Sequence, residues 1–161
     1  MNITYPYLPP NRSFLYVAAE HPHMVAAKNH AREHSLDATV PTGSVVVVGD
    51  MVVGRGANGS TYHEDHGCER VRQGVPTGQR YDLCEGCHPK NHSELRAIAD
   101  AQAQGHQLAG ASLYLWGHWW ACQDCWEAII AAGITDVFLV AGSEKLFNRD
   151  HPDNSIGRQF A

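Results

Sequence analysis

Residues 44–56 read SVVVVGDMVVGRG, and this stretch decides the first part of the fold. Two short runs of β-branched and apolar residues, Val45 to Val48 and Met51 to Val53, flank the pair Gly49-Asp50. A glycine-containing pair between two such runs favours a tight turn that joins antiparallel strands. The pattern therefore predicts a buried β-hairpin.

Helical and extended patterns lie on both sides of this hairpin. Upstream, residues 22–34 are rich in helix formers, and Pro22 marks the start because it disfavours a helical residue before it. Downstream, a helical pattern runs from Ser93 and ends before Gly105, a residue type common just after a helix. Three further elements are expected: a strand at 112–116, a helix at 121–132 with Trp126, Ile129 and Ile130 on one face, and a strand at 136–140. This order predicts an α/β domain with a central mixed sheet and helices on its faces.

The length of the chain fits a single domain. At 161 residues it is close to the usual size of one domain, so we assign residues 1–161 to one unit. Three parts lie outside the core pattern: an extended, proline-rich arm at 1–12, an insertion at 57–91 and a polar C-terminal segment at 142–161. The insertion is long for a structureless loop in a compact domain, so we expect it to be ordered by something other than a core.

Charge and hydropathy exclude several classes of protein. With 12 Lys and Arg against 17 Asp and Glu, the net charge is −5 and no basic stripe is present, which argues against a nucleic-acid partner. No apolar run approaches the roughly 18–20 residues of a membrane-spanning helix, and the N-terminus has no signal-peptide pattern. We therefore expect a cytoplasmic protein without membrane association. In such a protein, an odd number of cysteines, here five, favours metal binding or catalysis over disulfides.

Two short motifs stand at the starts of the two later helices. They are His92-Ser93-Glu94 and Cys122-Gln123-Asp124-Cys125. Cysteines three residues apart share one face of a helix, and the helix N-terminus stabilises their thiolates. Together with His92 they form a set of three ligands, which leaves the fourth tetrahedral position of zinc open to water. Glu94 is then placed to take a proton from that water without binding the metal.

The spacing His-x-Glu followed by Cys-x-x-Cys resembles the signature of the cytidine and deoxycytidylate deaminase superfamily. The resemblance covers most of residues 22–140, because the order of the expected elements is similar as well. Within the superfamily, GRGANGS at 54–60 and HSELRAI at 92–98 look like segments of the nucleotide-deaminating branch, closest to deoxycytidylate deaminases. The resemblance implies a three-layer α/β/α sandwich with a central mixed sheet.

The same resemblance implies a chemical activity. The chain would be a zinc-dependent hydrolase that releases ammonia from a small cytosine nucleotide, with dCMP to dUMP as the specific reaction. His92, Cys122 and Cys125 would hold the catalytic zinc. Glu94 would pass a proton to the ring nitrogen and then to the departing ammonia. Members of the superfamily usually assemble, so we also expect a homo-oligomer.

Three residues are candidates for contact with the substrate. By the resemblance, Asn58 would contact the sugar, although Asn-Gly is also a common turn former. Trp119 and Trp120 would border a flat base, or else serve as core or subunit-contact residues. Ala121 stands where the family usually has proline, which implies a pocket of different shape. The phosphate state of the substrate is left open by the sequence.

The insertion carries the other three cysteines. Cys68, Cys84 and Cys87 have the residue type and the Cys-x-x-Cys spacing of a closed, structural zinc site. Several nucleotide deaminases of the family carry a second zinc in this insertion, so the resemblance implies a second zinc here. We choose His66 as the fourth ligand, two residues before Cys68, over His63 and His88.

Other interpretations of these motifs stay open. Cys122 and Cys125 also fit a redox pair or buried small side chains, and both Cys-x-x-Cys pairs could share one zinc. Cys84 to His88 matches the pattern of a haem-attachment site. Gly54-x-Gly56-x-x-Gly59 has the spacing of a dinucleotide-binding motif, but no helical pattern follows it, so we interpret this glycine segment as a turn. The alternative functions are a deaminase of another base, nucleoside or tRNA adenosine, and a non-catalytic module stabilised by zinc.

Overall fold

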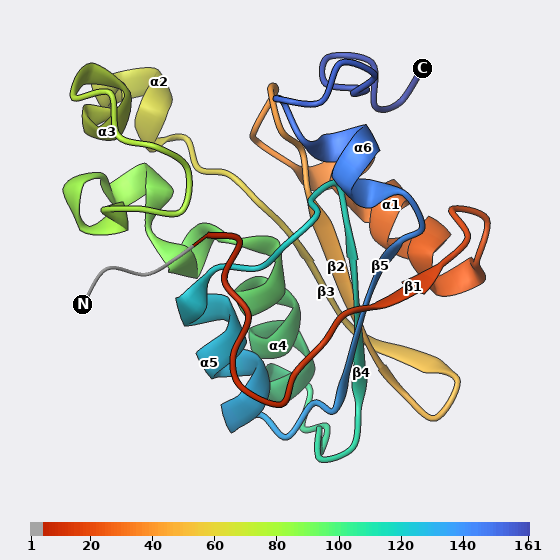
Figure 1. Ribbon diagram of the computed structural model, residues 1–161. Helices are drawn as coiled ribbons and strands as arrows, with labels where there is room; N and C mark the ends of the chain where they lie inside the picture. Colours follow the sequence, from red (N-terminus) through yellow and green to blue (C-terminus); the bar gives the residue numbers. More distant parts are fainter. Residues whose placement is uncertain (1–4) are drawn as a thin grey trace.

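The central layer is a five-stranded mixed sheet, seen in a computed structural model that describes residues 5–161 (Figure 1). Its order is β1-β5-β4-β2-β3. Strand β2 pairs antiparallel with β3 and β4, whereas β4 and β1 both run parallel to β5. The strands are β1 (Leu15–Val17), β2 (Gly43–Val48), β3 (Met51–Ala57), β4 (Ser112–Trp116) and β5 (Asp136–Val140).

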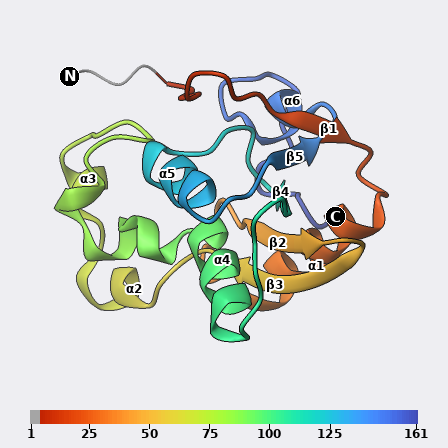
Figure 2. The same cartoon turned by 90° about the horizontal axis from the view of Figure 1, so that it is seen from below.

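Helices cover both faces of this sheet (Figure 2). One face carries α1 (Pro22–His34) and the short α6 (Ser143–Phe147), and the other carries α4 (Ser93–Ala103) and α5 (Gln123–Ala131). The insertion contains only short elements: α2 (Tyr62–His66), α3 (Glu69–Arg72) and the 3₁₀ turns η1 (Tyr81–Leu83), η2 (Glu85–Cys87) and η3 (Pro89–Asn91). The fold is therefore a three-layer α/β/α arrangement, as predicted.

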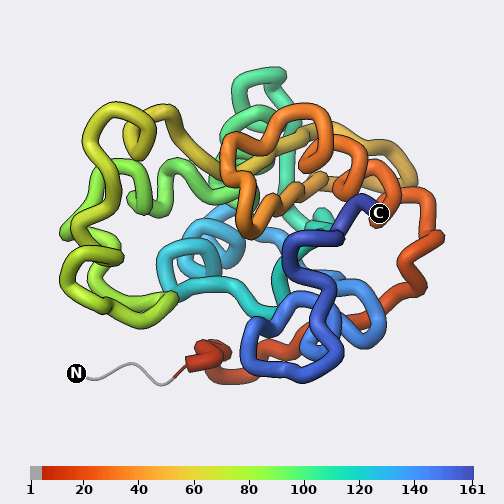
Figure 3. Tube along the Cα trace, turned by 90° about the horizontal axis from the view of Figure 1, so that it is seen from above, coloured from red at the N-terminus to blue at the C-terminus, as the bar shows by residue number. Residues whose placement is uncertain are grey.

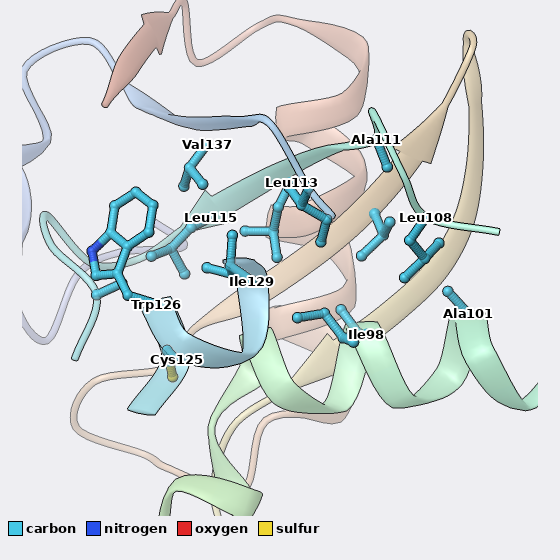
Figure 4. Close-up of a cluster of buried hydrophobic side chains, with 14 of the residues drawn as sticks. Ile98, Ala101, Leu108, Ala111, Leu113, Leu115, Cys125, Trp126, Ile129 and Val137 are labelled. Carbon is cyan, nitrogen blue, oxygen red and sulfur yellow. The ribbon is translucent and has the colours of Figure 1, made fainter. Parts of the chain in front are cut away.

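Alternation along the strands divides the core into two parts. In β4, Leu113 and Leu115 pack toward α4 and α5, whereas Tyr114 and Trp116 pack toward α1 and α6. Successive side chains of a strand point to opposite faces, so a central strand with apolar residues throughout fills both layers. Figure 4 shows the first of these clusters, in which Cys125 and Trp126 of α5 meet the sheet residues. The core thus fixes the start of α5, where the cysteine motif lies.

Glycines in β3 let α4 lie directly on the strand. A Cβ atom at Gly54 would lie 2.3 Å from the carbonyl oxygen of Ala97, and one at Gly56 would lie 2.3 Å from that of Ser93. No other residue fits such close contact between backbones. The interpretation of the glycine segment as a turn is therefore wrong, because β3 continues to Ala57. The glycines place the first turn of α4, and with it Ser93, firmly over the sheet.

Apart from the glycine segment, the expected elements differ from the structure in two details. The helix at 22–34, the hairpin, the strands at 112–116 and 136–140 and the two later helices are confirmed. Ile130, expected on the buried face of α5, is 43% exposed, whereas Ile129 is fully buried. The edge strand β1 was not predicted. Its pairing with β5 joins residues far apart in the sequence, so no local pattern signals it.

The insertion forms a lobe on one side of the molecule, away from the C-terminal segment (Figure 3). Of the expected arm at 1–12, residues 1–4 lie outside the described residues, and residues 5–13 have no helix or strand. The C-terminal segment contains α6 followed by turns. Across residues 5–161, none of the helices has the length and apolar character needed to cross a membrane.

Candidate functional site

The starts of α4 and α5 bring three metal-ligating side chains together. His92 is the N-cap of α4, Cys122 is the N-cap of α5, and Cys125 lies one turn further along α5. His92 Nδ1 lies 3.4 Å from Cys125 Sγ and 3.5 Å from Cys122 Sγ. The three ligand atoms all lie within 4.8 Å of one another, and we call these residues the His92 cluster. The two sequence motifs therefore meet in space.

The geometry of the His92 cluster fits zinc. With Zn–N near 2.0 Å and Zn–S near 2.3 Å, nitrogen and sulfur ligands of a tetrahedral ion lie about 3.6 Å apart. The observed N···S distances of 3.4 and 3.5 Å are close to this value. Zinc with three protein ligands keeps one position for water or substrate, as catalytic zinc sites do.

The thiols of the cluster differ in their affinity for protons. A hydrogen bond with Cys125, together with the hydrogen bond and charge of His92, lowers the pKa of Cys122 to about 5 against the opposing effect of burial. Burial raises the pKa of Cys125 well above its usual value. Burial alone would lower the pKa of His92, but its hydrogen bond with Cys122 and the charge there raise it. Because the thiolate is the form that binds metal, the cluster already favours one thiolate ligand.

Glu94 lies beside this cluster in the first turn of α4 and is 7% exposed. Burial raises the pKa of its carboxyl group, while the neighbouring His92 opposes that rise. Ser93 Oγ donates a hydrogen bond to Glu94 Oε2 at 3.1 Å, and Ser44 Oγ lies 2.8 Å from Ser93 Oγ. Both serines are fully buried, so this hydroxyl pair orients the carboxylate. Sequence reasoning missed the pair, because Ser44 reaches Ser93 only when β2 and α4 pack together.

The segment between β4 and α5 holds the tryptophans expected near the substrate. Trp120 is buried and its ring packs against Tyr5, with ring centroids 5.0 Å apart. Trp119 is half-buried, and Ala121 is buried in the core. His118 Nδ1 accepts the backbone N–H groups of Trp119 and Trp120 at 2.9 and 3.2 Å. Burial lowers the pKa of His118 to about 4, and the nearby His92 adds to the effect, so its ring is neutral at pH 7.

Asn58 follows β3 and uses most of its side chain to hold the loop after α1. Its Oδ1 accepts hydrogen bonds from Ser35 Oγ at 2.5 Å and from the backbone N–H of Thr42 at 2.9 Å. Its Nδ2 donates to the carbonyl oxygen of Val40 at 2.9 Å. An amide group has two N–H bonds, so one of them is left for a substrate. Asn58 therefore anchors the loop after α1, and residues 58–60 form no turn.

A second group of ligands lies in the insertion. His63, Cys68, Cys84 and Cys87 place their ligand atoms within 4.8 Å of one another, and we call them the His63 cluster. Cys68 Sγ lies 3.5 Å from Cys87 Sγ, and His63 Nε2 lies 3.1 Å from Cys84 Sγ. Three cysteines and one histidine are the ligand set of a closed zinc site.

The structure corrects one member of the expected set and one alternative. His66 does not belong to the His63 cluster, because its ring lies against Tyr62 on the same short helix, with centroids 4.5 Å apart. His63 takes the place expected for His66. The two Cys-x-x-Cys pairs do not share one site either, since they fall in separate clusters of the described chain.

Tyr81 is the main residue near the site that sequence reasoning missed. It lies in η1, and its ring meets the ring of His92 edge-on, with centroids 5.0 Å apart and planes at 84°. Burial raises the pKa of its phenol group. Its position three residues before Cys84 is the only sequence signal, and that spacing does not reveal a contact with His92.

Comparison with known proteins identifies a family. The sequence model of the cytidine and deoxycytidylate deaminase zinc-binding region matches residues 18–141, which include the His92 cluster and the His63 cluster. Comparison with curated proteins gives no match.

Solved structures give weaker likenesses. The chain is similar to a diaminohydroxyphosphoribosylaminopyrimidine deaminase/5-amino-6-(5-phosphoribosylamino)uracil reductase from Thermotoga maritima, with 22% identity, a TM-score of 0.46, and coverage of 73% of this chain and 28% of that one. It therefore spans little more than a quarter of the Thermotoga protein. It is also similar to a dCMP deaminase from the cyanophage S-TIM5, with 18% identity, a TM-score of 0.48, and coverage of 75% of this chain and 82% of that one.

The family match spans most of the sequence and contains every ligand of the His92 cluster as well as Glu94. The order of strands and helices and the ligand geometry agree with it. The chain therefore belongs to the cytidine and deoxycytidylate deaminase family.

Proposed function

We propose that this protein hydrolyses the exocyclic amine of a cytosine nucleotide, with the conversion of dCMP to dUMP as its specific reaction. The observation that carries the proposal is the buried carboxylate of Glu94 beside a cluster of three zinc ligands. A structural metal site has no use for a buried acid that is not a ligand. A deaminase needs one, because protons must move from water to the ring nitrogen and to the leaving amine.

The His92 cluster would hold zinc through His92 Nδ1 and the sulfur atoms of Cys122 and Cys125. When bound, zinc supplies an acidic water for attack on the carbon that bears the amine. Glu94 would first accept each proton of that water at its carboxylate and would then deliver it, one to the ring nitrogen and one to the amine, which leaves as ammonia. Burial raises the pKa of Glu94, which makes its protonated form accessible for this second step. Ser93 holds Oε2 in place during both transfers.

The substrate contacts belong to the same proposal. Trp119 and Trp120 would border the base, and their position three and two residues before Cys122 supports this. Asn58 would donate its remaining N–H to the sugar. The packing of Trp120 against Tyr5 supports a role as a rigid wall of the pocket.

We also propose a second, structural zinc in the His63 cluster, held by His63, Cys68, Cys84 and Cys87. The closed ligand set supports it, and so does the position of these residues in an insertion with only short helices. Metal analysis of the purified protein should then give two zinc ions per chain. One ion per chain would contradict this assignment.

A homo-oligomer completes the proposal. The outermost strand β1 carries Leu15 and Tyr16, which are 41% and 59% exposed, so it offers apolar surface at a sheet edge. Sedimentation equilibrium of the purified chain measures the assembly, and a monomer at micromolar concentration would contradict it.

The test is ammonia release by the zinc-loaded protein with dCMP, CMP, deoxycytidine, cytosine, guanine and adenosine. Glu94→Gln removes the proton acceptor and should lower turnover of dCMP at least about a hundredfold, with zinc content unchanged. Glu127→Gln is the matched control, because Glu127 lies on the exposed side of α5 and bonds only to Gln123 among the described side chains. Turnover of another substrate in place of dCMP would contradict the specific reaction. A zinc-loaded protein that turns over none of them would contradict deamination itself.

A further inference from the structure

Arg70 of α3 stands between the two metal-ligating clusters. Its Nη1 donates to Cys87 Sγ of the His63 cluster at 3.4 Å. Its Nε donates to the carbonyl oxygen of Gln79 and its Nη2 to that of Pro76, each at 2.8 Å. Its guanidinium group also lies over the ring of Tyr81, 4.6 Å from the centroid. One planar group therefore joins a metal ligand, a turn and an aromatic ring.

The turn at 76–79 and Tyr81 reach the neighbourhood of the His92 cluster. Tyr81 meets the ring of His92 edge-on. Gly78 is buried, and a Cβ atom there would lie 2.6 Å from Trp120 and 2.8 Å from Tyr5. The turn therefore packs directly on the tryptophan that precedes the cysteine motif. Tyr81 therefore covers His92, and the turn covers Trp120 beside it; we call the 76–79 turn and Tyr81 the roof of the site.

Tyr81 packs against the core, but the segment before it is held by few contacts apart from those of Gly78 and a hydrogen bond from the backbone N–H of Val75 to the carbonyl oxygen of Arg70. Residues 73–80 contain no helix or strand, and apart from Gly78 and Val75 their side chains are exposed. Gly74, Gly78 and Arg80 have φ angles of +65°, +89° and +50°, so the backbone turns sharply at three positions. A segment with so little core of its own is ordered by what it bonds to, and Arg70 supplies two of those bonds.

The charge of Arg70 suits its place beside the His63 cluster. Three thiolates and one neutral histidine around Zn²⁺ leave a net charge of −1, and the guanidinium group of Arg70 balances it. A hydrogen bond from a cation to a thiolate is stronger than one to a neutral thiol. Metal in the His63 cluster would therefore hold Arg70 at Cys87, and through Arg70 it would hold the roof.

We propose that Arg70 is a positioning residue that couples the His63 cluster to the substrate pocket, by fixing the 76–79 turn on Trp120 and Tyr81 on His92. This inference rests on the proposed function for its effect on catalysis. Its structural part, the order of the turn, stands independently. The second metal site then sets the shape of the pocket as well as stabilising the insertion.

Trypsin cleavage of the zinc-loaded full chain after Arg80 reports the order of the turn without any need for activity. Arg70→Gln should make this cleavage about tenfold faster, because a cleaved segment must first open locally. Arg72→Gln is the matched control: Arg72 lies in the same helix but bonds to Glu69 and to the carbonyl of His66. Trypsin should cleave Arg72→Gln after Arg80 at a rate within about twofold of that for the unchanged protein.

Activity and metal content separate the possible causes. With two zinc ions retained, Arg70→Gln should raise KM for dCMP about tenfold and change kcat much less, since Arg70 touches none of the reacting groups. Unchanged cleavage after Arg80 in Arg70→Gln would overturn the proposal, and so would equal acceleration in Arg72→Gln. If the protein turns over no substrate, the proposed function fails while the cleavage result still decides the role of Arg70.

A lysine variant covers the case in which Arg70→Gln loses metal or fails to fold. Arg70→Lys keeps a positive charge beside Cys87. The ammonium group of lysine is compact and not planar, so it cannot bond to the carbonyl oxygens of Pro76 and Gln79 and also stack on the ring of Tyr81. It should retain two zinc ions and still be cleaved several-fold faster after Arg80 than the Arg72→Gln control. Cleavage at the rate of the unchanged protein would overturn the proposal.

Discussion

His118 makes the stability of the fold depend on pH in a way that can be calculated. Its Nδ1 accepts hydrogen bonds from two backbone N–H groups, so this nitrogen carries no proton and the ring is neutral. Burial lowers the pKa of His118 from 6.5 to about 4 in the folded chain. In the unfolded chain the ring has its ordinary pKa, so below pH 6.5 the unfolded state binds more protons than the folded state. The contribution of His118 to the free energy of unfolding is therefore greatest above about pH 6.5. It falls as the pH drops and stops falling below about pH 4.

The size of the effect follows from the two pKa values. Between pH 7 and pH 5 the free energy of unfolding should fall by about 2 kcal/mol from this residue alone, which for a chain of this size is about 4–8 °C in the melting temperature. His118→Asn is the comparison, because the Oδ1 of asparagine can accept the same backbone N–H groups and does not titrate.

The assay is urea unfolding of both proteins at pH 7 and pH 5, at equal zinc concentration. The zinc ligands bind protons in both proteins, so their contribution cancels in the difference. The unchanged protein should lose about 2 kcal/mol more than His118→Asn over this range. Equal losses in the two proteins would refute the reasoning, because His118 would then have its ordinary pKa in the folded state.

Two further predictions concern hydrogen bonds near the site. Asn58→Ala removes three hydrogen bonds. It should lower the free energy of unfolding in urea by about 2–3 kcal/mol. An unchanged urea midpoint would show that the loop after α1 does not depend on these bonds. Ser93→Ala removes the hydrogen bond that orients Glu94 and should lower kcat for dCMP roughly tenfold with little change in KM. Ser44 bonds to Ser93 and not to Glu94, so Ser44→Ala should lower kcat less. A raised KM with unchanged kcat in Ser93→Ala would contradict the positioning role.

The elements that sequence reasoning predicted are those with strong local patterns. The hairpin at 44–56 and the helices that begin at Pro22 and Ser93 each carry their own signal in turn residues and periodicity. Strand β1 has three residues and owes its existence to a partner more than a hundred residues away, so no window of sequence contains it. Ile130 was misplaced because the buried face of α5 contains Cys125, Trp126 and Ile129, and Ile130 lies beyond the edge of that face.

The candidate site shows the same division. The spacing of His92, Cys122 and Cys125 within their motifs placed them at two helix starts, and the packing of α4 against α5 brought them together. The choice between His63 and His66 could not be made in this way, because both lie on one short helix three residues apart. The direction of that helix decides it: His63 Nε2 points at Gly86, whose Cβ would lie only 2.6 Å from it. Such a fit is a tertiary contact without a local pattern.

The parallel pairing of β1 with β5 has a consequence for synthesis of the chain on the ribosome. Leu15 pairs with Phe138, so the first strand emerges 123 residues before its partner β5. At typical rates of translation this delay is roughly 6–25 s, during which an apolar strand has no sheet to join. Pairings of such long range also slow folding after release, because a large loop must close before any contact rewards it. We therefore expect the hairpin and α4, whose contacts are closer in sequence, to form before the edge strand joins the sheet.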